Sequence, residues 1–170
     1  MNTNLNPEKV VKDLRYDFHT FSIDRFITHV GEIKKREIIS IPWTMPPTLF
    51  GAWMSDDEEP KEYIFYRDNV PLIHQVHIQL HELSHFLLGH VTLHINRKKI
   101  ANVLKKNTPL PFTELPRLRS SDKSELEVQA ETLAALIQKQ VIKHSNLDQL
   151  ASDLSSETKL ANFLKTMGLS

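Results

Sequence analysis

The feature that most constrains this chain is a long apolar segment that carries histidines and a carboxylate in its interior. Residues 69–88 show helical periodicity, with four apolar residues on one narrow face: Val76, Leu80, Leu83 and Leu87. Further apolar residues lie on the other faces: Ile78, Phe86 and Leu88. Asn69 is the expected cap, Pro71 suits the first turn, and Gly89 favours an end after Leu88. We therefore expect a central, buried helix.

The sequence His81-Glu82-Leu83-Ser84-His85 stands inside this segment. Histidines four positions apart project from one face of a helix, so both imidazoles can reach a single metal ion. Glu82 points about 100° away, where it can contact a metal-bound water without binding the metal. This is the HExxH arrangement of two zinc ligands with a general base between them. Because burying unpaired imidazoles is costly, the pattern favours a metal site over a chance pair of surface histidines.

A catalytic zinc ion keeps three protein ligands and one open position, so a third ligand is required. The chain has no cysteine, and Val91 stands where the compact HExxHxxGxxH pattern has its third histidine. A carboxylate on the second strong helix, predicted over 122–143, is therefore favoured. The inner stripe of this helix is Glu127, Ala130, Ala134, Ile137 and Val141. We expect Glu127 to be the ligand, with Glu131 as an alternative. Glu125 lies on a more solvent-exposed side of the same helix.

The remaining segments indicate a small sheet and several shorter helices. Three β-rich segments predict strands: residues 37–41, 49–54 and 62–66. An amphipathic helix is expected over 22–35, capped by Ser22, and residues 55–60 are expected to form a solvated hairpin loop. Residues 92–119 read as a connection that contains a short helix at 95–104. The sequence therefore predicts an α+β fold with a three-stranded sheet and a buried HExxH helix.

Charge and composition argue against several other classes of function. The 21 basic residues are balanced by 21 acidic residues, which argues against direct binding to nucleic acid. With 4 glycines and no GxGxxG or GxxxxGK[ST] motif, a phosphate-binding loop is not expected. No apolar run approaches the roughly 20 residues of a membrane helix, and no signal peptide is recognisable. We therefore expect a cytoplasmic protein that does not bind membranes.

The domain organisation follows from the same patterns. We expect one metallopeptidase domain over residues 22–145, preceded by an N-terminal arm over 1–21. Residues 146–170 are expected to form a C-terminal helical appendage with one or two small helices.

Five further residues have two interpretations each. His74 and His77 are expected to be partly buried core histidines, with contact to the metal site or substrate as the alternative. His90 follows the helix and is expected to interact with its dipole, although it could also orient a reaction intermediate. Tyr63 and Tyr66 lie on a predicted strand, and the β-propensity of tyrosine explains their presence there. The alternative is that they orient a reaction intermediate, as His90 could.

The two motifs together resemble the ImmA/IrrE family of zinc metallo-endopeptidases. The first is His81-Glu-Leu-Ser-His85-Phe-Leu-Leu-Gly-His, similar to the HELxH-type helix of that family. The second, Glu127-Val-Gln-Ala130-Glu-Thr-Leu133-Ala134, is similar to the family's E-x-x-A-x-x-F-A helix, with Leu133 in place of the usual phenylalanine. The resemblance implies a zincin-like fold and a helix-turn-helix repressor as substrate. It also implies His81, His85 and Glu127 as ligands of Zn²⁺ and Glu82 as base.

Two hypotheses of different classes follow. The first is a zinc-dependent endopeptidase that cleaves a helix-turn-helix transcriptional repressor in a stress or mobile-element switch. The alternative is a non-catalytic zinc-fold binding module of a toxin–antitoxin or repressor pair. The intact Glu82 favours the enzyme, because a purely structural zinc site does not need a base. A structural site would also close its fourth position, and no fourth ligand is evident in the sequence.

Overall fold

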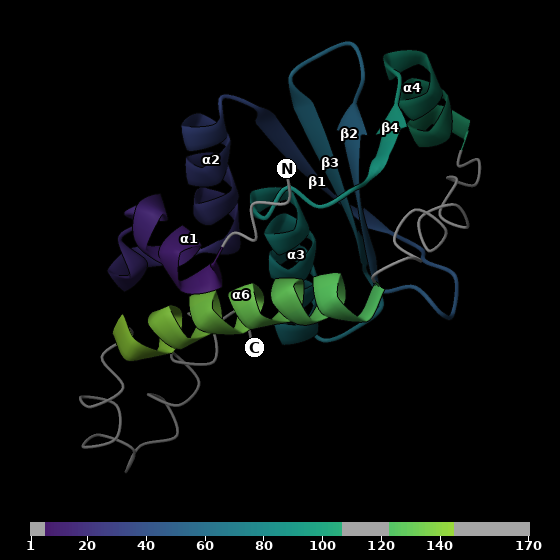
Figure 1. Ribbon diagram of the computed structural model, residues 1–170. Coiled ribbons are helices and arrows are strands. Elements are labelled where there is room, and N and C mark those ends of the chain that lie inside the picture. The colour runs from purple at the N-terminus through teal and green to yellow at the C-terminus, as the bar shows by residue number, and fades with distance from the viewer. Residues whose placement is uncertain (1–5, 107–122, 145–170) are drawn as a thin grey trace.

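The computed structural model describes residues 6–106 and 123–144 of the chain (Figure 1). Within these residues the protein has an α+β fold of five α-helices and one four-stranded mixed sheet. Its elements, in chain order, are α1 (Pro7–Leu14), the 3₁₀ helix η1 (Phe18–Thr20), α2 (Ile23–Lys34), β1 (Glu37–Trp43), β2 (Gly51–Asp56), β3 (Lys61–Arg67), α3 (Leu72–Leu87), β4 (Leu93–Ile95), α4 (Arg97–Lys106) and α6 (Lys123–His144). The helical appendage expected over 146–170 lies outside the described residues.

The sheet has the strand order β1-β3-β2-β4. Strand β3 pairs in parallel with β1 and antiparallel with β2, and β2 pairs in parallel with β4. The three predicted strands are therefore confirmed. The sequence pattern does not predict β4, because three residues are too few to show an alternating pattern. The short helix expected in the same region forms as α4, two residues later than predicted.

The observed strands differ from the predicted ranges by one or two residues at their ends, and two of these differences have a clear cause. Strand β1 continues through Pro42 to Trp43, because β1 is an edge strand and a missing backbone N–H can face away from the sheet. Ser55 and Asp56, expected in the solvated loop, are buried at the end of β2. The loop prediction is wrong at Asp56 because its side chain organises the turn instead of facing water.

The carboxylate of Asp56 stabilises the turn of the β2–β3 hairpin by hydrogen bonds. Its Oδ1 accepts the backbone N–H groups of Glu58 and Glu59, each at 2.9 Å, and its Oδ2 accepts the hydroxyl of Tyr63 at 3.0 Å. Burial opposes ionisation of this carboxyl, but the three donors outweigh it and hold the pKa of Asp56 below its usual value. Burial and the neighbouring Asp56 raise the pKa of Tyr63 to about 12.

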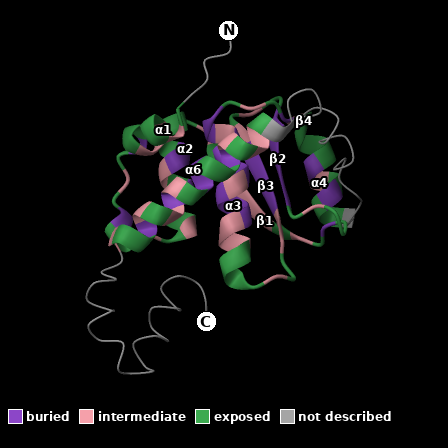
Figure 2. Cartoon of the chain, turned by 60° about the horizontal axis from the view of Figure 1, so that its bottom comes forward, coloured by how far each residue is buried: buried purple, intermediate pink, exposed green. Residues whose placement is uncertain are grey.

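The two faces of the sheet are covered by different helices. On one face α2 and α3 pack against the strands, and α6 crosses over α3 (Figure 1). On the other face Ile100 and Val103 of α4 pack against β2 and β3. Figure 2 shows the buried residues concentrated in β2 and β3 and on the inward faces of the helices. Helix α3 is therefore central, as its apolar sequence predicts.

The apolar core between α2, α3 and α6 also includes residues from the expected N-terminal arm. Leu14 of α1 and Phe18 of η1 are buried in the cluster that α2, α3 and α6 share. Helix α1 packs along α6, and Asn6 caps its start by accepting the backbone N–H of Glu8. Ser22 caps α2 as predicted, accepting the backbone N–H of Arg25. Helix α1 and η1 are thus packed against the same core as the rest of the described chain.

The ends of α3 determine where the motif lies. The helix begins at Leu72 with Pro71 as its cap residue, so the expected cap at Asn69 is wrong by two positions. It ends as predicted, with Gly89 in the left-handed region at φ 68°. This conformation lets the N–H of His90 reach the carbonyl of His85 at 3.0 Å. The chain therefore turns back and places His90 beside the end of the motif.

No helix among the described residues is long and apolar enough to cross a membrane.

Candidate metal centre

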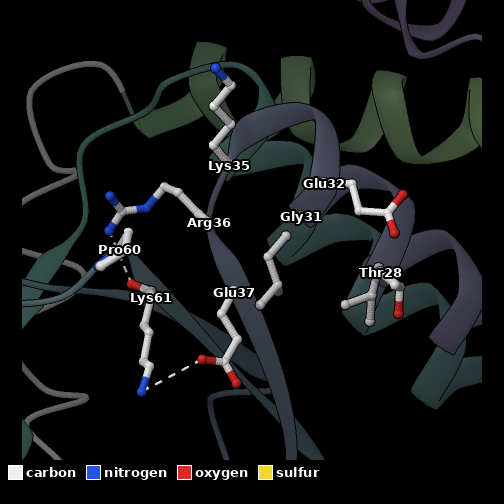
Figure 3. Close-up of a pocket in the computed structure, with 10 residues that line it drawn as sticks. Thr28, Gly31, Glu32, Lys35, Arg36, Glu37, Pro60 and Lys61 are labelled. Carbon is white, nitrogen blue, oxygen red and sulfur yellow. Dashed lines mark hydrogen bonds and ion pairs between the residues drawn. The ribbon is translucent and has the colours of Figure 1, made fainter.

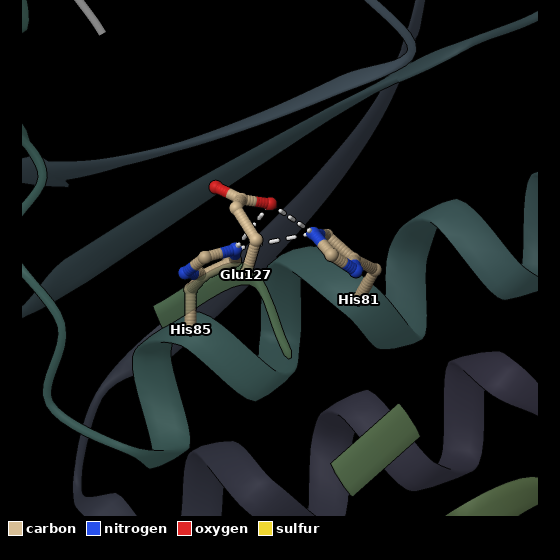
Figure 4. Close-up of side chains that lie close together, drawn as sticks. All are labelled: His81, His85 and Glu127. Atoms are coloured by element: carbon tan, nitrogen blue, oxygen red, sulfur yellow. Dashed lines mark hydrogen bonds and ion pairs between the residues drawn. The ribbon is translucent and has the colours of Figure 1, made fainter. Parts of the chain in front are cut away.

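Helices α3 and α6 bring His81, His85 and Glu127 together (Figure 4). The Nε2 atoms of the two histidines are 3.1 Å apart. Glu127 Oε2 lies 3.1 Å from Nε2 of His81 and 3.6 Å from Nε2 of His85. Ala130 and Ala134 of α6 are completely buried, and their small side chains permit the close approach of the two helices. Each residue thus directs one ligand atom to a common point.

The spacing of these three atoms fits a single zinc ion. Zinc–nitrogen bonds of about 2.0–2.1 Å in a tetrahedral arrangement place neighbouring ligand atoms about 3.3–3.4 Å apart. The observed separations of 3.1, 3.1 and 3.6 Å lie on both sides of this value. Two imidazoles and one carboxylate also form a donor set that zinc binds in catalytic sites. The three residues can therefore hold a metal ion and leave a fourth position for another ligand.

The site is buried at one end and accessible at the other. The side chain of His85 is 0% exposed, that of His81 is 20% exposed and that of Glu127 is 35% exposed. Burial opposes a charge on His81, but the hydrogen bond with Glu127 and the negative charge of Glu82 outweigh it, and the pKa of His81 is raised. The same acidic surroundings favour a metal cation beside this ring.

Glu82 is buried beneath the start of β2. A Cβ atom added to Gly51 would lie 2.9 Å from Cγ and 3.0 Å from Oε1 of Glu82. The absence of a side chain at position 51 therefore creates the space that Glu82 occupies. The sequence around Gly51 does not reveal this role, although a glycine in a strand often marks a close approach of this kind.

Glu131, the alternative third ligand, lies on another side of His81. Its Oε2 is 3.2 Å from Nδ1 of His81 and 3.2 Å from Nε2 of His77. The geometry thus places Glu127, and not Glu131, beside both Nε2 atoms. Glu131 instead accepts a hydrogen bond at the nitrogen of His81 that faces away from the cluster, and it accounts for the position of His77. Sequence spacing alone does not reveal this contact.

Among the other residues with two interpretations, His90 contacts one of the candidate ligands. Nδ1 of His90 is 2.8 Å from Nδ1 of His85, on the side of that ring opposite to Glu127. His74 is exposed near the start of α3, so the expectation of a partly buried core histidine is wrong at this position. Tyr63 belongs to the cluster on the other face of the sheet, where its hydroxyl binds Asp56. Burial and the charges of two aspartates, on α2 and after β3, raise the pKa of Tyr66.

A separate pocket of about 390 Å³ lies between the end of α2, the start of β1 and the β2–β3 turn (Figure 3). Lys61 and Glu37 form an ion pair across its rim, with 3.5 Å between Nζ and Oε2. None of the three candidate ligands lines this pocket. The pocket is therefore distinct from the candidate metal centre.

No protein-family model matches this chain, and a search of curated proteins finds no match either. The functional conclusion therefore rests on the geometry of His81, His85 and Glu127, which is compatible with a metal site of the HExxH type.

Proposed function

We propose that the protein is a zinc-dependent endopeptidase with a zincin-like fold. The observation that carries this proposal is the triangle formed by two Nε2 atoms and one carboxylate oxygen, with the motif glutamate buried on the next position of the same helix. The order of the two motif helices along the chain supports the resemblance to the ImmA/IrrE family. That resemblance makes a helix-turn-helix repressor the first candidate substrate.

Each residue has a defined task in this reaction. His81, His85 and Glu127 would hold the zinc ion, which when bound lowers the pKa of a water towards about 7 and polarises the scissile carbonyl. Glu82 then accepts the proton of the attacking water and donates it to the amine that leaves when the peptide bond breaks. Burial beneath Gly51 keeps the carboxylate of Glu82 in one place before the substrate arrives.

An extended peptide would add to the sheet at one of its edges. Strand β2 lies between β3 and β4, and all six of its residues are buried, although β4 pairs only with Met54, Ser55 and Asp56. The edges of the sheet are β1 and β4. Strand β4 is the candidate for substrate binding, because only residues 88–92 separate it from the end of the motif helix.

Replacement of Glu82 by glutamine tests the proposed reaction. The variant keeps the size of the side chain but removes the base, so hydrolysis should fall about 10²–10⁴-fold while zinc remains bound. Zinc-loaded wild type and variant are incubated with dye-labelled casein and with candidate helix-turn-helix repressors, and the fragments are identified by mass. Glu58→Gln, on an exposed residue of the hairpin, is the matched control and should retain full activity.

Two outcomes would contradict parts of the proposal. If the zinc-loaded wild type binds a repressor tightly and cleaves nothing, the protein is a binding module and not an enzyme. If Glu82→Gln cleaves as fast as wild type, Glu82 is not the base.

A further inference from the structure

The second nitrogen of His85 lies against another histidine. Nδ1 of His85 is 2.8 Å from Nδ1 of His90, and His85 is completely buried. Two neutral imidazoles in such a contact share one proton, so one ring donates and the other accepts. The direction of this hydrogen bond decides which nitrogen of His85 carries its proton, and therefore whether Nε2 has a lone pair for a metal ion.

The contacts beyond His90 set that direction. Gln129 Nε2 is 3.2 Å from Oε1 of Glu125, and because a carboxylate only accepts, the amide group of Gln129 must donate there. The amide oxygen of Gln129 then faces Nε2 of His90 at 3.3 Å, so this nitrogen must carry a hydrogen. In the neutral His90 ring the proton is thereby on Nε2, and Nδ1 is left as the acceptor.

We infer that His90 and Gln129 are positioning residues that hold His85 in the tautomer protonated on Nδ1, which leaves its Nε2 lone pair directed to the metal position. The hydrogen bonds run from Glu125 at the surface, through Gln129 and His90, to the buried ring of His85. We call this chain of hydrogen bonds, formed by Glu125, Gln129, His90 and His85, the relay. Its functional meaning rests on the proposed zinc site. The proton positions themselves follow from the contacts among the four residues.

The local fold explains how His90 reaches this place. The left-handed Gly89 reverses the chain at the end of α3, and the backbone N–H of His90 binds the carbonyl of His85 at 3.0 Å. The HExxH helix thus carries its own orienting residue five positions after the second histidine. Gln129 lies on α6 two residues after Glu127, so the helix that supplies the third ligand also supplies the next member of the relay.

The other motif histidine has an orienting partner of a different kind. Nδ1 of His81 contacts the carboxylate of Glu131 at 3.2 Å, and because a carboxylate only accepts, this nitrogen carries a proton. Nε2 of His81 is therefore the atom left to bind a cation, in place of its hydrogen bond with Glu127. Nδ1 of His81 donates directly to the carboxylate of Glu131. Nδ1 of His85 is instead connected to the carboxylate of Glu125 through the side chains of His90 and Gln129.

Side-chain ¹⁵N spectroscopy of the metal-free protein tests the relay without any enzymatic assay. In the wild type, long-range ¹H–¹⁵N correlations should show His85 protonated on Nδ1. In His90→Phe this preference should be lost, and zinc affinity, measured by competition with a chromophoric chelator, should fall about 10–100-fold. His90→Asn should restore most of the affinity, because its side-chain oxygen can accept the same proton. His94→Ala is the control on an exposed histidine of β4 and should change neither quantity.

A second variant covers the case in which His90→Phe does not fold. Gln129→Leu alters a half-buried position on α6 and should weaken the tautomer preference of His85 and the zinc affinity in the same direction. If metal-free wild type carries the His85 proton on Nε2, or if all relay variants bind zinc as tightly as wild type, the relay is refuted although the metal site stands. If His85 is protonated on Nδ1 but wild type binds no zinc, the relay stands and the proposed function fails.

Discussion

Replacing Gly51 with alanine tests how the structure holds Glu82. A Cβ atom at this position would lie 2.6 Å from Cγ2 of Ile78 and 2.9 Å from Cγ of Glu82. Ordinary contacts begin near 3.4 Å, so these neighbours must move by about 0.5–0.8 Å to accommodate one methyl group. Both neighbours belong to α3, and Ile78 has a branched side chain with little freedom to turn away.

The expected cost has two parts. Overpacking a tight interior by one methyl group destabilises a protein by about 1–3 kcal/mol. Misplacement of a catalytic group by about 1 Å costs about 100-fold in rate, so the smaller shift of Glu82 should reduce hydrolysis about 10–100-fold. Zinc should remain bound in Gly51→Ala, because the atoms nearest to the added methyl group belong to Ile78 and Glu82 and not to a candidate ligand.

The assay combines urea denaturation, zinc content and hydrolysis of dye-labelled casein by the folded protein. Gly31→Ala is a matched control, because its added Cβ would lie 2.7 Å from the carbonyl oxygen of Arg36, away from the motif helix. It should lower stability by a similar amount while the folded protein keeps its rate of hydrolysis. If Gly51→Ala hydrolyses casein at the wild-type rate with unchanged stability, the contact between β2 and Glu82 does not position the base.

Three further predictions concern the third ligand, acid stability and the core. Glu127→Ala should abolish zinc binding in an equilibrium dialysis assay, whereas Glu131→Ala, which removes contacts to Nδ1 of His81 and to His77 but no ligand atom, should weaken binding far less. Asp56→Asn should be less stable than wild type at pH 7, and since the pKa of Asp56 is lowered by folding, urea midpoints should converge as the pH falls below about 4. Leu83→Ala, at a fully buried position of α3, should lower the free energy of unfolding by about 2–5 kcal/mol in the same denaturation experiment.

The sequence is most informative where a helix carries a regular pattern. The apolar periodicity of α3 and the Glu127–Ala130–Ala134 stripe of α6 each predict which face turns inward, and the structure brings both faces together. Helical spacing fixes the direction of a side chain within one element, so the relation between His81 and His85 could be predicted without tertiary information.

Contacts that depend on two distant elements could not be predicted. Strand β4 has only three residues, and its pairing with β2 depends on the chain reversal at Gly89. The contact between Gly51 and Glu82 requires the position of β2 on α3, which no local pattern contains. The contact between His85 and His90 requires the left-handed conformation of Gly89. The sequence indicates that this glycine ends the helix, but it does not indicate where the side chain of the next residue is placed.

Zinc content of the purified protein is the measurement that tests the metal centre most directly. The protein is loaded with zinc, freed of excess metal and analysed by elemental mass spectrometry, together with His81→Ala, His85→Ala and the control His94→Ala. We predict one zinc ion per chain in wild type and the control, and loss of most zinc in the two motif variants, because each removes a ligand of the same ion. Equal zinc content in all four proteins, or no zinc in wild type, would contradict the assignment of His81, His85 and Glu127 as a metal site.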